Sequence, residues 1–79
     1  MKYNYYIAIL FKGGRYRFVT SINKSTAHWE DGQPARKFQL NLAKDIVFGL
    51  VSNGWPAVIV TAPASFELAN PEKEAVDNA

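Results

Sequence analysis

Alternating apolar and polar positions near the N-terminus predict a β-hairpin. Aromatic and β-branched residues dominate Tyr3–Lys12 and Arg15–Ile22, and such residues favour strands. Between these runs, Gly13-Gly14 supplies the positive φ angles that a two-residue hairpin loop needs. A loop of these two residues places Ile9 opposite Phe18 across the hairpin.

This register divides the hairpin into an apolar face and a mixed face. The apolar face carries Tyr5, Ile7, Ile9, Phe11, Tyr16, Phe18 and Ile22, with Thr20 as its polar member. The mixed face carries Tyr6, Ala8, Leu10, Lys12, Arg15, Arg17 and Val19. Because the more apolar face of a strand pair turns to the core, we expect the second set to stay open. We call it the candidate interaction face.

Three further elements are expected after the hairpin. Ser25–Glu30 predicts a short third strand, and Ala57–Ala62 predicts a last strand that Pro63 ends. Between them, apolar residues recur every three or four positions over Ala35–Asn53. This period predicts an amphipathic helix, with Pro34 at its start.

Two glycines carry information about this helix. Gly54 suits the left-handed position after the last helical turn, with Trp55 as the hydrophobic residue beyond it. A glycine inside a helix, such as Gly49, costs about 1 kcal/mol relative to alanine. We therefore expect a strand to approach the helix closely at Gly49.

The elements together predict an α+β fold with the order β-β-β-α-β. One helix covers one face of a four-stranded, mainly antiparallel sheet. The strand order 3-2-1-4 puts the apolar first strand inside the sheet, with the last strand parallel to it through a helical crossover. We expect one domain over residues 1–66 and an acidic, disordered tail over residues 67–79.

The size of the chain bears on its oligomeric state. A chain of 79 residues buries only about 60% of the surface that its unfolded form exposes, so its stability is marginal. Disulfides and a structural zinc site do not contribute, because the sequence has no cysteine and one histidine. Oligomerisation is the remaining source of stability, so we expect a homodimer.

Charge is unevenly distributed along the chain. The net charge is +2, with +5 over residues 1–63 and −3 over residues 64–79. The apolar runs are far shorter than a membrane span, and the N-terminus lacks the pattern of a signal peptide. We therefore expect a cytoplasmic location.

The candidate interaction face has three interpretations. The first is a solvated face, as antiparallel sheets often have. The second is self-association or docking of a protein partner through this face or through a free sheet edge. The third is a nucleic-acid surface. In the last case Lys12, Arg15 and Arg17 would hold phosphates, with Tyr6 as the one aromatic residue of the face. We expect a non-enzymatic accessory or protein-interaction domain that self-associates. The alternative is a small nucleic-acid-binding protein.

The residue pattern does not indicate an enzyme, a metal site or a cofactor site. His28, Glu30 and Asp31 are close in sequence, but a lone histidine beside acids is usually a surface residue. Gly13-Gly14 lacks the following Gly-Lys-Ser and helix of a phosphate loop. We therefore expect no catalytic residue and no cofactor.

The middle of the chain is similar to a known group of sequences. The matching residues are Trp29-Glu30-Asp31-Gly32-Gln33-Pro34-Ala35, Phe38, Ala43, Asp45-Ile46, Phe48-Gly49-Leu50, Asn53-Gly54 and Ala57-Val58. Over roughly residues 26–60 they resemble small uncharacterised proteins of lactic-acid and related Gram-positive bacteria. The shared motifs are of the kind that specify a fold, and the resemblance implies no activity.

Overall fold

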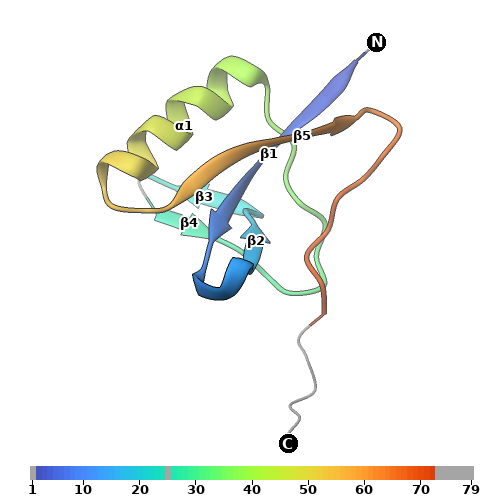
Figure 1. Cartoon of the computed structure of the whole chain (residues 1–79). Coiled ribbons are helices and arrows are strands. Elements are labelled where there is room, and N and C mark those ends of the chain that lie inside the picture. Colours follow the sequence, from blue (N-terminus) through green and yellow to red (C-terminus); the bar gives the residue numbers. More distant parts are fainter. Residues whose placement is uncertain (1, 25, 73–79) are drawn as a thin grey trace, which may run out of the picture.

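A computed structural model describes residues 2–24 and 26–72. Their elements are β1 (Tyr3–Leu10), the 3-10 turn η1 (Lys12–Gly14), β2 (Tyr16–Phe18), β3 (Ser21–Asn23), β4 (Thr26–His28), α1 (Leu40–Ser52) and β5 (Ala57–Pro63). Three strands form an antiparallel sheet in the order β2-β1-β5, and β3 and β4 form a separate two-stranded sheet. The helix α1 packs on the three-stranded sheet (Figure 1). The α+β class and the inner position of β1 are confirmed, whereas the single four-stranded 3-2-1-4 sheet is wrong.

The hairpin loop is one residue longer than predicted. The Phe11 N–H donates to the Arg15 carbonyl at 2.8 Å, which leaves Lys12–Gly14 as a three-residue loop. Both glycines in it have positive φ angles, 78° and 76°, so the reversal lies where the sequence predicts it. Ile9 now faces Arg17. Because a shift of one residue turns every side chain of a strand to the other face, the predicted faces are right for β1 and wrong for β2.

The predicted second strand is divided between the two sheets. The last backbone bond from this strand to β1 runs from the Val19 N–H to the Ile7 carbonyl, at 2.8 Å. The next position beside β1 is occupied by Phe38, whose N–H donates to the Tyr5 carbonyl at 2.8 Å. The chain therefore turns away, and β3 pairs with β4 instead. β4 lies within the predicted third strand, of which Ser25 lies outside the described residues.

The helix begins at Leu40, later than its predicted start at Ala35. The segment before it is extended, and three of its N–H groups bond to distant carbonyls: Ala35 to Leu68 (2.9 Å), Arg36 to Val19 (3.1 Å) and Phe38 to Tyr5 (2.8 Å). These tertiary bonds override the local helical period, which is a weak determinant on its own.

The late helix start reverses the direction of β5. The extended segment carries the chain to the start of β1, where Phe38 and Tyr5 form an antiparallel bridge. The helix then runs back along β1, and β5 returns antiparallel to it, with Ile9 opposite Ala57 (Figure 1). The predicted parallel crossover is therefore wrong.

The helix ends as its sequence predicts. Gly54 has a φ of 89°, its N–H donates to Val51, and the Trp55 N–H donates to Leu50. These two bonds define a Schellman motif. The expectation for Gly49 is wrong, because a Cβ atom built there would meet nothing within 4 Å.

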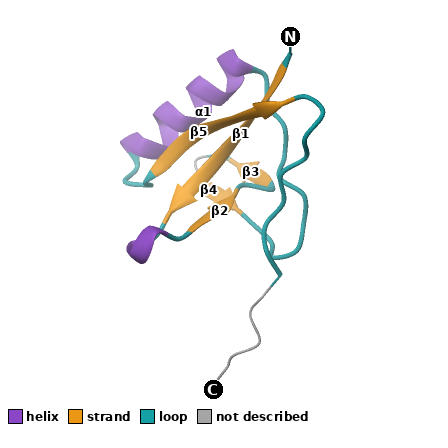
Figure 2. Ribbon diagram, turned by 45° about the vertical axis from the view of Figure 1, so that its right-hand side comes forward, coloured by secondary structure: helices purple, strands orange, loops and turns teal. Residues whose placement is uncertain are grey.

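Side chains pack against both faces of the three-stranded sheet. The helix side holds Ile7, Ile9, Val19, Ala43 and Leu50. The other side holds Tyr6, Ala8, Phe18, Ala35 and Ala62, with Leu68 packed against them. The C-terminal segment supplies this second cover and runs beside the segment that precedes α1 (Figure 2).

The C-terminal segment extends the body beyond its predicted boundary at residue 66. Residues 67–72 pack on the body, with Leu68 half-buried and Asn70 only 4% exposed. The rest of the predicted tail, residues 73–79, lies outside the described residues. Among the described residues, the one α-helix, α1, has 13 residues and is too short to cross a membrane.

Candidate interaction surfaces

The seven residues of the candidate interaction face do not form one open surface. Tyr6, Ala8 and Val19 are fully buried, the first two beneath the C-terminal segment and Val19 on the helix side. The other four residues, Leu10, Lys12, Arg15 and Arg17, are accessible to solvent to different degrees. The register shift separates Val19 from Tyr6, and the packed C-terminal segment covers the middle of the face. A role of the accessible residues in interactions remains a prediction.

Asn70 covers the outer edge of β2 at Phe18. Its Oδ1 accepts from the Phe18 N–H at 2.6 Å, and its Nδ2 donates to the Phe18 carbonyl at 2.9 Å and to the Glu30 carbonyl at 3.0 Å. The two bonds to Phe18 replace those that a further strand would make. Covering an edge in this way prevents pairing with another chain. No local pattern indicates this role, because Asn70 lies 52 residues from Phe18 along the chain.

The outer edge of β5 has no such cover among the described residues. β5 is the last strand of its sheet, and the Leu10 N–H donates to the Pro56 carbonyl at 2.9 Å. Antiparallel ladders alternate bonded and non-bonded pairs, so this bond fixes which residues of β5 face β1. The N–H and C=O groups of Ile59 and Thr61 therefore point outward, away from the sheet. No charged residue interrupts β5, whose sequence is AVIVTAP.

Two exposed apolar side chains continue this edge onto the face opposite α1. Val58 is 38% exposed and Leu10 is 43% exposed. Val58 pairs with Ala8 across the strands, and Leu10 follows Ala8 on the same face. We call the outer edge of β5, Val58 and Leu10 together the edge surface. Natural edge strands usually carry charges or bulges that prevent association, and this edge lacks the charges.

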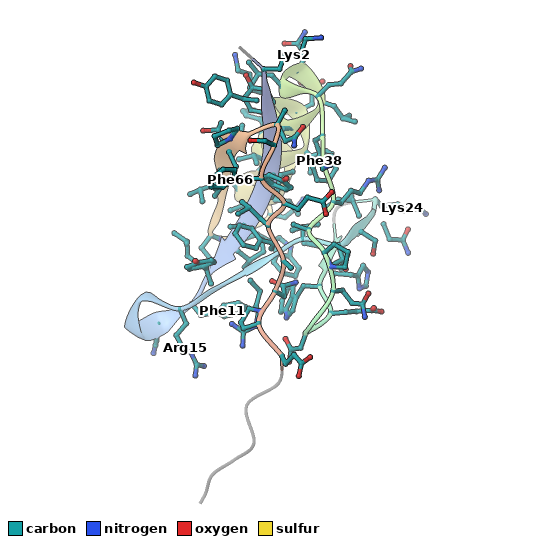
Figure 3. The ribbon with its side chains drawn as sticks, turned by 90° about the vertical axis from the view of Figure 1, so that its right-hand side faces the viewer. Lys2, Phe11, Arg15, Lys24, Phe38 and Phe66 are labelled. Carbon is teal, nitrogen blue, oxygen red and sulfur yellow. The ribbon has the colours of Figure 1, made fainter. Side chains whose placement is uncertain are left out.

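Arg15 and Arg17 line two adjoining grooves at the loop end of the hairpin. The Trp29 groove, of about 250 Å³, is lined by Phe11, Arg15, Arg17, Trp29 and Asp31. The Tyr16 groove, of about 290 Å³, is lined by Arg15, Tyr16, Arg17, Phe18, Ala69 and Pro71. Arg15 lies at this end of the molecule and points away from the body (Figure 3). We call the two grooves and their shared arginines the hairpin site.

The two arginines differ in how firmly they are held. Arg17 donates from Nε to Asp31 Oδ1 at 3.1 Å and from an Nη to the Tyr16 carbonyl at 2.9 Å, and 23% of its side chain is exposed. Arg15 and Lys12 are exposed, and neither has a side-chain hydrogen bond or ion pair within residues 2–24 and 26–72. The hairpin site thus combines one fixed guanidinium with two adaptable cations.

Each groove of the hairpin site contains an aromatic pair. Phe11 and Trp29 meet edge to face with ring centroids 5.4 Å apart, and so do Tyr16 and Phe18. The sequence placed Tyr6 beside the arginines as their one aromatic neighbour. The structure instead buries Tyr6 beneath the C-terminal segment. It brings four other rings to the arginines, because the register and the loop after β4 differ from the prediction.

The residues considered for catalysis do not assemble into a cluster. His28 and Glu30 are exposed, and Asp31 pairs with Arg17. No group of three His, Cys, Asp or Glu residues with metal-binding geometry occurs in the part of the chain that the structure describes. Comparisons with protein-family models, with curated proteins and with solved structures find no significant match for this chain.

Proposed function

We propose that this protein is a non-enzymatic, cytoplasmic interaction domain that pairs with a second copy of itself through the edge surface. The observation that carries the proposal is the contrast between the two edges of the sheet. Asn70 covers the β2 edge at Phe18, and the segment before α1 bonds to Val19 and Tyr5 on the same side of the sheet, whereas β5 ends the sheet with an uncharged strand. Strand addition at an exposed edge is a common mode of protein recognition.

The geometry of β5 suits pairing with an identical strand. In an antiparallel pair centred on Val60, Ile59 of one copy faces Thr61 of the other. These two residues point their backbone groups outward, so they form a hydrogen-bonded pair in which each copy donates and accepts. The two copies in this pairing are related by a two-fold rotation, which is the usual symmetry of homodimers. The result is a continuous six-stranded sheet.

Two considerations favour a second copy over a different protein. Pairing places the exposed Val58 side chain of each copy opposite Ala62 of the other, where burial contributes about 25 cal/mol per Å² of apolar surface. This contribution matters for a small domain with no cysteine and hence no disulfide. The edge surface also carries no charge that would repel an identical surface.

The decisive experiment is sedimentation velocity over a concentration series, with variants of the edge surface. We expect wild-type protein to dimerise and Val58→Lys to be monomeric, because pairing would bury two ammonium groups near the centre of the interface. Leu10→Lys changes a residue of β1, one strand away from the pairing edge, and should weaken the dimer less than Val58→Lys. The matched control is Phe48→Lys, which replaces a side chain that is 76% exposed on α1 and should leave the dimer intact.

Two outcomes would contradict the proposal. One is a wild-type protein that stays monomeric at the highest concentrations that sedimentation allows. The other is equal dissociation by Val58→Lys and Phe48→Lys, which would indicate general hydrophobic association in place of strand pairing. Circular dichroism of each variant checks that a monomer is folded.

A further inference from the structure

We propose that the hairpin site binds single-stranded nucleic acid, with a phosphate at the two arginines and bases in the two grooves. This inference does not depend on dimerisation. The sites are distinct, because the edge surface lies on β5 and β1, whereas the hairpin site lies at β2 and the loops beside it.

The arrangement of the two grooves carries the inference. Arg15 and Arg17 line both grooves, so they lie between the Phe11–Trp29 pair and the Tyr16–Phe18 pair. A nucleic-acid strand has the same alternation, with a charged phosphate between planar bases. Proteins that bind single strands without sequence preference combine basic grooves with aromatic rings on which bases stack.

The charges of the hairpin site favour an anion of this type. The charged residues that line the grooves, Arg15, Arg17 and Asp31, sum to +1, and Lys12 in the adjoining loop raises the local charge to +2. The Arg17–Asp31 bond at 3.1 Å uses Nε and fixes the guanidinium without using all of its donors. Arg15 and Lys12 remain available to neighbouring phosphates.

The size and exposure of the grooves distinguish single strands from other ligands. Both volumes, about 250 and 290 Å³, lie below the usual range of about 300–1,000 Å³ for small-molecule pockets. Each groove therefore has room for one planar ring, such as a base, and is small for a whole cofactor. A duplex keeps its bases stacked and paired, so it would offer the arginines phosphates but would leave the aromatic rings without a partner.

Fluorescence anisotropy of a labelled oligothymidylate of about 12 nucleotides tests this inference. We expect binding at about 20 mM salt that weakens as salt rises, with a slope of log K against log salt near −2 for three phosphate contacts. Binding should also quench tryptophan fluorescence, because Trp29 lines one groove. A duplex of the same length should bind at least tenfold more weakly.

Two substitutions separate the charge from the aromatic contribution. Arg15→Gln should lower the affinity about tenfold and make the salt slope shallower by nearly one unit. Tyr16→Leu keeps an apolar side chain but removes the aromatic face, so it should lower the affinity about tenfold with the salt slope unchanged. Lys44→Gln on the exposed side of α1 removes the same charge as Arg15→Gln and should change the affinity less than twofold.

Three results would overturn the inference. The first is no change in anisotropy for wild-type protein at low salt. The second is equal weakening by Arg15→Gln and Lys44→Gln, which would indicate attraction by net charge alone. The third is competition by polyglutamate as strong as that by unlabelled oligothymidylate, which would assign the site to acidic peptides. Sedimentation of Arg15→Gln should still show the oligomeric state of wild type, so a failure here is distinguishable from a failure of the dimer.

Discussion

Removing the Asn70 side chain should destabilise this protein more than any substitution of an exposed polar residue. In Asn70→Ala, the Phe18 N–H and carbonyl lose their only side-chain partner, and the Glu30 carbonyl loses one donor. Asn70 is 4% exposed and Phe18 is 7% exposed, so water does not readily replace these bonds.

The expected loss follows from the number of buried groups left without a partner. Each costs about 1–3 kcal/mol. The Glu30 carbonyl counts least, because it also accepts from the Gln33 N–H at 3.4 Å. The two groups of Phe18 therefore set the scale, and we expect a loss of about 3 kcal/mol. A domain of this size has a total stability of about 4–12 kcal/mol, and its melting temperature should fall by about 12–24 °C.

Thermal and urea unfolding followed by circular dichroism measure this loss. The control is Asn41→Ala, which removes the same side chain from an exposed position of α1 and should change the stability by less than about 0.5 kcal/mol. Asn70→Asp retains the oxygen that accepts from Phe18 but places a carboxylate beside two carbonyls. It should be at least as destabilising at neutral pH and recover on acidification, because protonation removes the charge and restores one donor. A loss below about 1 kcal/mol for Asn70→Ala, or equal losses for Asn70→Ala and Asn41→Ala, would refute the reasoning.

Four other substitutions test three separate parts of the structure. Gly49→Ala should raise the free energy of unfolding by about 0.5–1 kcal/mol in urea titrations, because the added methyl group meets empty space; a decrease would mean that the helix is more closely packed there. Thr61→Pro should keep the melting temperature of the monomer within a few degrees but abolish dimerisation, because it removes an outward N–H. Val60→Pro removes an N–H that faces β1 and should unfold the domain, and equal effects of the two prolines would contradict the assigned ladder. Asn4→Val should raise the melting temperature slightly, since the Asn4 Nδ2 is buried and has no hydrogen-bond partner among residues 2–24 and 26–72; a clear fall would show that this amide has a stabilising contact.

Local signals in the sequence predicted the parts of the fold that short-range interactions determine. The hairpin reversal at Gly13-Gly14 and the helix end at Gly54 each depend on a positive φ angle, which glycine adopts at little cost. The inner position of β1 followed from its apolar residues. These features lie within a few residues of the amino acids that specify them.

The features that the sequence did not predict depend on distant contacts. The start of α1 moves because Phe38 bonds to Tyr5 and Ala35 bonds to Leu68. The direction of β5 follows from that shift. The register of β2 changed because three residues, rather than two, form the loop, and no pattern in either strand distinguishes these loops. The errors in the helix start and in the direction of β5 concern which two segments meet, and a periodic pattern does not contain that information.

The separation in sequence between contacting residues also explains what could be predicted of the two candidate sites. The sequence indicated that Arg15 and Arg17 are surface cations, and the structure places both in the hairpin site. It could not indicate that Phe11 and Trp29 lie beside them, because that contact depends on the course of the chain after β4. The edge surface was foreseen as a free sheet edge, but its residues were not, since the direction of β5 decides which groups point outward.

The bonds of Asn70 to Phe18 also have a consequence for the order of events during folding. They join residues 52 positions apart in the sequence, and β1 completes its ladder only with β5. During synthesis the N-terminal hairpin therefore emerges with both of its edges unpaired. They stay unpaired until the last third of the chain, which holds β5 and Asn70, has been made. Long-range pairing of this kind slows folding, and the exposed strands of the nascent protein are then most vulnerable to aggregation.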